Sequence, residues 1–300
     1  MRKKTAELTL TLPADFDREA FLDFHRRDTE AVAEKVDAGA LKKAFIWQQV
    51  PTLLTVDFDQ PGHAHVTLHC DDNPPSASAS LDAFAGHLLG LDQPTQAFEA
   101  QAGRYSLVGA MVRSQAGLRV PQSASPFEAL SWAIIGQQIS VAAAVSIRRR
   151  FIQRLGRRHS NGLYCYPDAN DVASTNAEAL KACGFSRSKA ECLLTVARRC
   201  LDEALLPEIH MAQPDLETLR KRLLAIRGLG PWSVHYALLR GYAWMDGSLH
   251  GDVAVRRAIQ QLQGNASPPS LSETERWLAE FRPWRSLMAA HLWESLSVNA

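Results

Sequence analysis

The cysteines of this chain are few, and their spacing suits neither a metal site nor a disulfide framework. No two of them form a Cys-x-x-Cys pair, and none follows residue 200. The pattern argues against a cysteine zinc site and against the cross-linked scaffold of a small secreted domain. The five cysteines are Cys70, Cys165, Cys183, Cys192 and Cys200.

A long apolar run is also missing. The N-terminal Met-Arg-Lys-Lys is followed by Thr-Ala-Glu and not by the apolar segment of a signal peptide. The longest apolar stretches are too short to span a bilayer. Together with the unpaired cysteines, these absences predict a reduced, cytoplasmic protein with no membrane partner, and we expect a monomer.

The chain has almost no net charge, +1 at pH 7, but its charge is unevenly distributed. Residues 1–102 carry 16 acidic and 9 basic side chains, whereas residues 103–300 carry 16 acidic and 24 basic ones. Between Arg104 and Tyr164 there are nine arginines and one acid, Glu128. The second part of the chain is therefore the candidate surface for a polyanion, although a solvated charged face would carry the same pattern.

The first 102 residues combine strand and helix signals. Apolar residues recur with a period of two over residues 8–12 and in two runs that flank Asp59-Gln60-Pro61-Gly62, which predicts a hairpin. Asp17 can cap a helix that carries Phe21 and Phe24, and residues 80–89 have a helical pattern. These signals predict an N-terminal domain, residues 1–102, with a small antiparallel sheet and helices on one face.

The pattern becomes helical from residue 125. Ser125-Pro126-Phe127-Glu128 has the form of a capping box with proline at the first helical position. Helical stripes follow as far as the C-terminus, without a repeat. The sequence therefore predicts an α+β protein, in which an all-helical body over residues 103–300 follows the sheet.

The most informative segment lies between residues 226 and 252. It reads Ile-Arg-Gly-Leu-Gly-Pro-Trp-Ser-Val-His-Tyr, then a helical stretch, then Leu-His-Gly-Asp. Gly228 can end one helix in a left-handed conformation, and Pro231 suits the first position of the next. Gly230 allows close approach of the backbone. The result is a helix–hairpin–helix over about residues 214–241, whose unbonded N–H groups suit a phosphate.

Several stretches resemble the 3-methyladenine DNA glycosylase II (AlkA-type) branch of the helix–hairpin–helix DNA glycosylase superfamily. The hairpin, with Asp252 twenty-two residues after Gly230, is similar to the superfamily's signature. Residues 117–121 with 133–141, residues 184–190 and residues 283–293 resemble other helices of the branch. The resemblance covers about residues 103–300 and implies a two-lobed helical body with a cleft between the lobes.

The resemblance places the catalytic aspartate on Asp252. This residue also suits the N-cap of the helical run after it, where a helix terminus stabilises negative charge. A carboxylate there can stabilise the cationic sugar that forms as a base departs, and can orient water. Aromatic side chains can wall a pocket for a flipped base. The match puts Trp293 and Tyr236 in that pocket, with Trp232 and, more weakly, Phe24 as further candidates; core packing is the alternative role for each.

Bifunctional relatives place a lysine two residues after the second hairpin glycine, where this chain has Trp232. Without that amine, the resemblance implies a monofunctional enzyme of base excision repair. It would remove alkylated bases from damaged double-stranded DNA and leave the abasic site intact. We expect no cofactor and no side-chain metal ligand, but the family holds a monovalent or divalent cation with main-chain carbonyls of the hairpin.

Predicted contacts with DNA fall on the hairpin and on the turn between the first two helices of the body. Relatives carry an apolar wedge in that turn, which fills the gap left by the flipped base. Gln138 occupies the wedge position here and is polar, so the adjacent Ile139 is the alternative. The predicted DNA-binding residues are Gly228, Leu229, Gly230, Gln137, Gln138, Ile139 and Ser140.

Two other functions fit parts of this pattern. A non-catalytic DNA-binding protein would use the hairpin alone, and its Asp252→Asn variant would behave like the wild type. A glycosylase for oxidised or deaminated bases would share the fold. The missing lysine, and the missing cysteines of the iron–sulfur cluster that some relatives carry, argue against most of that group.

Overall fold

The computed structural model describes residues 5–72, 81–208 and 214–297. Its N-terminal part contains a five-stranded antiparallel sheet of order β1-β5-β4-β3-β2. Val56 pairs with Val66 across β4 and β5, which confirms the predicted hairpin. The strands are β1 (Thr5–Thr11), β2 (Glu34–Asp37), β3 (Ala40–Trp47), β4 (Val50–Asp57) and β5 (His63–Cys70).

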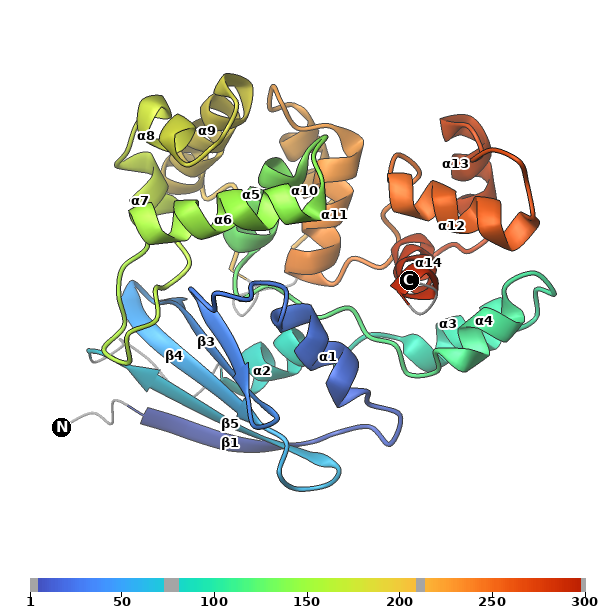
Figure 1. Ribbon diagram of the computed structural model, residues 1–300, viewed down its shortest axis with the longest axis horizontal. Helices are drawn as coiled ribbons and strands as arrows, with labels where there is room; N and C mark the ends of the chain where they lie inside the picture. Colours follow the sequence, from blue (N-terminus) through green and yellow to red (C-terminus); the bar gives the residue numbers. More distant parts are fainter. Residues whose placement is uncertain (1–4, 73–80, 209–213, 298–300) are drawn as a thin grey trace.

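Two helices, α1 (Arg18–His25) and α2 (Leu81–Leu89), share one apolar core with the sheet. Asp17 caps α1 as predicted, because its side chain accepts from the N–H of Ala20 at 3.0 Å. Phe21 of α1 and Phe84 of α2 pack with sheet residues in this core. The sheet with its helices is visible at the bottom of Figure 1. The predicted start of α2, residue 80, lies outside the described residues.

The sequence pattern did not predict β2 and β3. These strands are joined by a turn at Ala38 and Gly39, whose φ angles are +48° and +79°. Lys43 of β3 is only 2% exposed, whereas its neighbour Lys42 is exposed. A lysine on a buried position interrupts the apolar alternation, so the strand is hidden from a reading of hydrophobic periodicity.

The helical body forms two lobes, as predicted (Figure 1). The first lobe lies beside the sheet and contains α5 (Pro126–Gly136), α6 (Val141–Leu155), α7 (Ala169–Ala173), α8 (Ala177–Ala182), α9 (Arg187–Glu203), α10 (Leu216–Leu224) and α11 (Pro231–Tyr242). The second lobe contains α3 (Thr95–Ala102), α4 (Gly109–Ser114), α12 (Val253–Gln263), α13 (Leu271–Ala279) and α14 (Arg285–Ser297). The α+β fold is thereby confirmed.

The second lobe brings together two parts of the chain that are far apart in sequence. The ring of Phe98 in α3 lies 4.9 Å from that of His291 in α14, and α4 also contacts α14. Phe98 and Ala102 belong to the core of the helical body. The chain therefore joins that core before residue 103, where the sequence placed the start of the second domain.

The start of α5 differs in one detail from the predicted capping box. Ser125 accepts from the N–H of Glu128 at 3.1 Å, as expected. The carboxylate of Glu128, however, accepts from the N–H of Ala124 at 3.0 Å, one residue before the cap, and also binds Lys43 of the sheet at 2.8 Å. Glu128 thus serves the contact between sheet and helices. None of the helices in the described part of the chain has the length and apolar character needed to cross a bilayer.

Candidate active site

The turn between α10 and α11 has the geometry predicted for a helix–hairpin–helix. Gly228 has a φ of +96°, and a Cβ there would lie 3.0 Å from Cβ of Cys192, so both conformation and space require glycine. Pro231 is the first residue of α11. Gly230 precedes it as the N-cap and provides no side-chain cap. The first N–H groups of α11 are therefore left for an external acceptor.

Gly230 is not required by its own backbone conformation. Its φ of −95° and ψ of 172° are extended values that any residue adopts, and a Cβ built there meets no atom within 4 Å. The missing side chain leaves the backbone of the hairpin open to close approach from outside. This is the property that a phosphate contact would use.

Gln137 braces the hairpin from the end of α5. Its Nε2 donates to the carbonyl of Gly228 at 2.9 Å and to Oγ of Ser233 at 2.8 Å. Lys189 of α9 holds the same segment, because its Nζ donates to the carbonyls of Ile135 at 2.9 Å and Gln137 at 2.7 Å. The sequence assigned Gln137 to DNA binding and did not predict either brace. The assignment to DNA stays a prediction, and the structure adds a positioning role.

The turn after Gln137 lies at the surface. Gln138 is exposed and has a φ of +56°, which is uncommon for a residue other than glycine. Ile139 is 38% exposed, and Ser140 caps α6 by accepting from the N–H of Ala143 at 3.3 Å. A non-glycine residue held in this conformation often marks a functional loop. Either Gln138 or Ile139 could insert into DNA from here, and the identity of the wedge stays a prediction.

Asp252 is held by four N–H donors. It caps α12 as the sequence predicts, since its Oδ1 accepts from the N–H groups of Ala254 at 2.9 Å and Val255 at 3.1 Å. Two indoles add to these bonds: Trp232 Nε1 donates to Oδ2 at 2.8 Å, and Trp293 Nε1 donates to Oδ1 at 3.2 Å. All four donors are electrically neutral, so none of them cancels the charge of the carboxylate.

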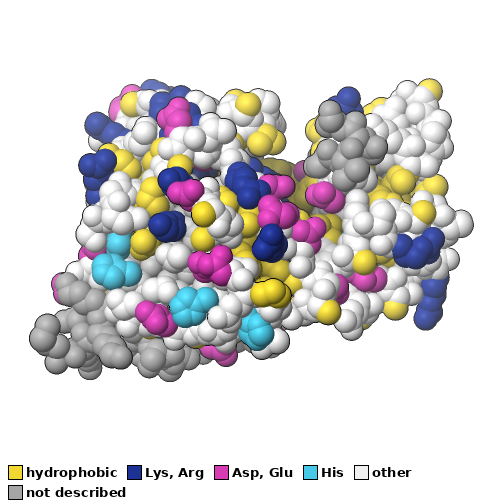
Figure 2. All heavy atoms as spheres, turned by 60° about the horizontal axis from the view of Figure 1, so that its bottom comes forward, with side chains coloured by type: hydrophobic (Ala, Val, Ile, Leu, Met, Phe, Trp, Pro, Cys, Tyr) yellow, Lys and Arg dark blue, Asp and Glu magenta, His cyan; other side chains and the backbone are white. Residues whose placement is uncertain are grey.

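Three of the predicted pocket aromatics form one cluster, and two of them bind this carboxylate. Trp232 and Tyr236 stack on α11 with their ring centroids 5.4 Å apart, and Tyr236 lies 6.0 Å from Trp293. Trp293 comes from α14, so the cluster spans both lobes. Figure 2 shows the surface hollowed between these lobes. The arrangement joins a carboxylate and aromatic faces at the boundary between the lobes.

Phe24, the fourth predicted aromatic, lies against the guanidinium of Arg240, which also contacts the rings of Tyr236 and Trp293. Cζ of Arg240 lies 4.4 Å from the ring centroid of Phe24, 5.8 Å from that of Tyr236 and 5.9 Å from that of Trp293. Arg240 is 6% exposed, and burial lowers its pKa to about 10. The side chain is therefore still a cation at neutral pH. Its Nη1 donates to the carbonyl of Pro121 at 2.9 Å, which fixes the guanidinium against the rings.

Two members of the cluster, Arg240 and Trp132, were not predicted from the sequence. Helix spacing could have indicated both, because residues four apart share one face. Arg240 follows Tyr236 by four residues on α11, and Trp132 precedes Gly136 by four on α5. Trp132 Nε1 donates to the hydroxyl of Tyr236 at 3.1 Å, and a Cβ on Gly136 would lie 3.7 Å from the ring of Trp232. Trp132 thus fixes the orientation of Tyr236.

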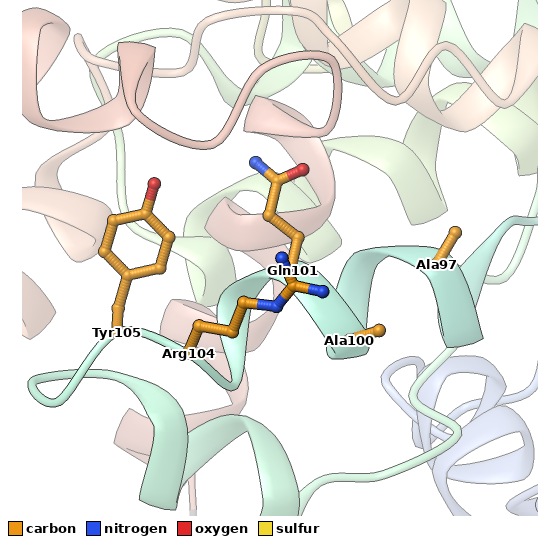
Figure 3. A pocket seen from close by; sticks show the side chains of 5 residues that line it. All are labelled: Ala97, Ala100, Gln101, Arg104 and Tyr105. Atoms are coloured by element: carbon orange, nitrogen blue, oxygen red, sulfur yellow. The ribbon is translucent and has the colours of Figure 1, made fainter.

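A separate pocket of about 530 Å³ lies at α3 and the turn after it (Figure 3). None of the predicted site residues lines it. Gln101 Nε2 donates to the carbonyl of Arg282 at 3.3 Å, and the Tyr105 hydroxyl donates to that of Glu280 at 3.2 Å. These bonds fasten α3 to the segment before α14, so we assign this pocket to packing within the second lobe.

Comparison with known families agrees with this geometry. A family model described as "HhH-GPD superfamily base excision DNA repair protein" matches residues 131–283, which is just over half of the chain. The matched segment includes the hairpin and Asp252. The chain belongs to this superfamily. Trp293 lies beyond the residues that the family model matches, and the structure shows its bond to Asp252 directly.

Individual relatives point to one branch of the superfamily. The Escherichia coli DNA-3-methyladenine glycosylase 2 is 32% identical over 239 residues, which are 78% of each chain. The Bacillus subtilis DNA-3-methyladenine glycosylase is 24% identical over 294 residues, 96% of this chain and 97% of that one. The solved structure of an Archaeoglobus fulgidus 3-methyladenine DNA glycosylase has the same fold, with a TM-score of 0.79 and 20% identity over 95% of this chain and 97% of that one. The predicted resemblance is confirmed.

Proposed function

We propose that this protein is a monofunctional DNA glycosylase that hydrolyses the N-glycosidic bond of alkylated bases in double-stranded DNA. The reaction is the first step of base excision repair. One observation carries the proposal: the carboxylate of Asp252 is held by neutral N–H donors beside stacked aromatic rings. The relatives named 3-methyladenine glycosylases support the choice of substrate class.

Asp252 is placed to act on the sugar. As the base departs, positive charge develops on the sugar, and a nearby carboxylate stabilises it. A carboxylate oxygen offers about two lone-pair sites. Oδ1 already accepts three N–H bonds, whereas Oδ2 accepts one, from Trp232. We therefore assign to Oδ2 the contact with the sugar or with the attacking water.

The flipped base would lie against Trp232, Tyr236 and Trp293. An aromatic face attracts a cationic alkylated base. Arg240 opposes that attraction, because its guanidinium already lies against Tyr236 and Trp293. Charge therefore contributes less to selectivity than the rings alone would suggest. We expect broad specificity, governed by the weakness of the glycosidic bond in alkylated nucleotides.

The absence of lyase activity is the finer part of the proposal. Trp232 occupies the position of the nucleophilic lysine of bifunctional relatives, and its ring nitrogen is a donor to Asp252. An indole N–H cannot form a Schiff base with the sugar. The enzyme should release the base and leave the strand uncut.

A panel of duplexes, each with one defined lesion, tests this function. Alkali should reveal abasic sites after incubation with alkylated duplexes, whereas samples without alkali should show intact strands. Borohydride should trap no covalent adduct. Efficient trapping would disprove the monofunctional assignment, and release of only oxidised or deaminated bases would disprove the substrate class. Tight binding to DNA with no base release would indicate a DNA-binding protein instead.

The hairpin is proposed to bind the DNA backbone, and Gly230→Val tests that contact. A Cβ at residue 230 meets no atom within 4 Å, and the backbone there is extended, so the fold should persist. Damaged and undamaged duplexes should lose affinity to a similar extent, on the order of tenfold, because a phosphate contact is blind to the base. Gly86→Val, at another glycine with open space, is the matched control. A loss confined to damaged DNA would contradict the backbone contact.

The hairpin cation, the cytoplasmic location and the monomeric state remain proposals. A main-chain cation would have to share the carbonyls of the turn with existing bonds. The carbonyl of Gly228 accepts from Gln137 at 2.9 Å, and that of Ile226 accepts from the N–H of Leu229 at 3.1 Å. The donor set fits a weakly held cation, and no step of the reaction depends on it.

A further inference from the structure

Three side chains with metal-binding atoms meet where the sheet joins the helical body. His69 belongs to β5, Asp71 follows that strand, and His159 lies in the loop between α6 and α7. Nε2 of His159 lies 3.2 Å from Nδ1 of His69 and 3.2 Å from Oδ1 of Asp71. The three ligand atoms all lie within 4.8 Å of one another. The cluster is separate from the aromatic residues around Asp252.

The two separations of 3.2 Å are close to those of ligands around a small cation. Zinc binds imidazole nitrogen and carboxylate oxygen at about 2.0–2.2 Å with tetrahedral geometry, which sets neighbouring ligand atoms about 3.3 Å apart. Two imidazoles with one carboxylate favour zinc over magnesium or calcium. We propose that His69, Asp71 and His159 bind one zinc ion, with water as the fourth ligand. The sequence did not predict it, because the two histidines are 90 residues apart.

The surroundings of His159 resemble the second shell of a metal site. Its Nδ1 lies 3.0 Å from Oδ1 of Asn161, an oxygen that also accepts from the N–H of Leu163 at 3.1 Å. With zinc on Nε2, the ring proton lies on Nδ1 and is donated to Asn161. Nδ1 also lies 3.1 Å from the backbone nitrogen of Asn161, so this residue holds the ring from both its side chain and its main chain.

The carboxylate is oriented as well. Oδ2 of Asp71 accepts from the N–H of Ser160 at 2.9 Å, which turns Oδ1 toward His159. His159 is 3% exposed, so a metal bound there would be shielded on one side by protein. Histidine side chains are visible on the face of the molecule shown in Figure 2.

The site would clamp the sheet to the first lobe. The loop that carries His159 already bonds to the sheet domain, since Tyr164 N–H donates to the carbonyl of Val32 at 3.0 Å and Arg157 donates to that of Gln49 at 3.0 Å. A metal shared by His69 and His159 would lock this contact. The expected consequence is added stability of the folded protein, independent of base release.

Cobalt substitution and calorimetry of the full chain test the proposal. Metal-stripped protein should bind one equivalent of Zn²⁺, and one equivalent of Co²⁺ should give the strong visible absorption of four-coordinate cobalt. The variants His159→Gln and Asp71→Asn should lose this binding. Asn161→Ala should weaken it roughly 10- to 100-fold, as second-shell losses do. The control His65→Gln, on the same strand but outside the cluster, should bind as the wild type does.

Three results would overturn the proposal. The first is no stoichiometric binding by the wild type. The second is equal binding by Asp71→Asn, which should fold because the altered side chain is partly exposed, at 24%, and keeps its shape. The third is a thiolate-to-cobalt charge-transfer band, which would place the metal on a cysteine. Zinc should also raise the melting temperature of the wild type but not that of Asp71→Asn.

Discussion

The buried carboxylates of Glu34 and Glu128 and the carboxylate of Asp252 are held in opposite ways. Glu34 and Glu128 are buried with Lys43 and Arg148: Lys43 Nζ lies 2.8 Å from each carboxylate, and Arg148 Nη2 lies 3.0 Å from Glu34. Burial alone would raise the pKa of Glu34, but the two cations hold it well below its usual value. The carboxylate of Asp252, in contrast, is held by the dipoles of four uncharged N–H groups.

The difference separates a structural site from a catalytic one. In the buried group, two negative and two positive charges cancel, and the side chains come from β2, β3, α5 and α6, so the group ties the sheet to the helical body. At Asp252, neutral N–H donors orient the carboxylate but leave its charge available. A developing cation can therefore be stabilised beside Asp252 and not beside Glu34.

The largest expected effect is on the buried group. Lys43→Met should leave two carboxylates without their shared cation and lower the free energy of unfolding by about 3–5 kcal/mol. Urea denaturation followed by circular dichroism measures this loss. Lys42→Met, at the exposed neighbour, is the control and should stay close to the wild type. A loss below 1 kcal/mol in Lys43→Met would mean that the ion cluster does not join the two domains.

Asp252→Asn should give the complementary result. The amide cannot offset positive charge on the sugar, so base release should fall on the order of 10²-fold or more, with binding to lesion DNA retained. Single-turnover excision and gel-shift titration measure the two quantities. Its free energy of unfolding should change far less than that of Lys43→Met. Activity close to that of the wild type would exclude Asp252 as the catalytic carboxylate.

Trp232→Phe should have a smaller effect on the same site. It removes one N–H donor from Oδ2 but keeps an aromatic face for the base. A hydrogen bond to a charged group contributes about 1.5–3 kcal/mol, and we expect base release to slow by roughly tenfold, which corresponds to the lower end of that range. Trp132→Phe, which removes an indole bond to Tyr236 but none to Asp252, is the matched control. Equal losses in the two variants would show that ring packing matters and the bond to Asp252 does not.

The smallest expected effect is on the pH dependence of stability, through His25, which bonds to Glu34 of the buried group. Burial lowers the pKa of His25 below 6.5, although its bond to Glu34 at 2.9 Å and the charge of Glu128 oppose this shift and Lys43 adds to it. As the pH falls, His25 is therefore protonated in the unfolded chain before it is protonated in the folded protein. The stabilisation is complete above pH 6.5 and is lost as the pH falls toward the folded pKa.

His25→Gln should remove this dependence. Between pH 6.5 and 5.5 the wild type should lose up to about 1.4 kcal/mol per pH unit more than the variant. His235 and His291, whose pKa values burial also lowers, act equally in both proteins. Denaturation curves at the two pH values measure the difference. Parallel losses in wild type and variant would show that His25 is protonated in the folded protein.

The parts of the site that follow from local spacing could be predicted from the sequence. Asp252 directly precedes a helical run, so its role as an N-cap follows from local sequence. Trp232 and Tyr236 lie four residues apart, so their place on one face of a helix does so as well. Trp293 reaches Asp252 only because two lobes pack together, and it was found by resemblance. Lys43 was missed, since a buried lysine depends on carboxylates from other elements. The face of α11 that carries Arg240 could have been predicted from its spacing to Tyr236, but its burial could not, because the rings of Phe24 and Trp293 that lie against it come from other elements.

The joining of α3 and α4 to α12–α14 also determines when the site can form during synthesis. A ribosome releases the sheet and the first lobe while residues 253–297 are still unmade. Helices α3 and α4 emerge early, yet α14, against which they pack, is made only after the first lobe. Trp293 arrives with it. A nascent chain can therefore display the hairpin before it has a complete pocket, and it can excise a base only after α14 has brought Trp293 to Asp252.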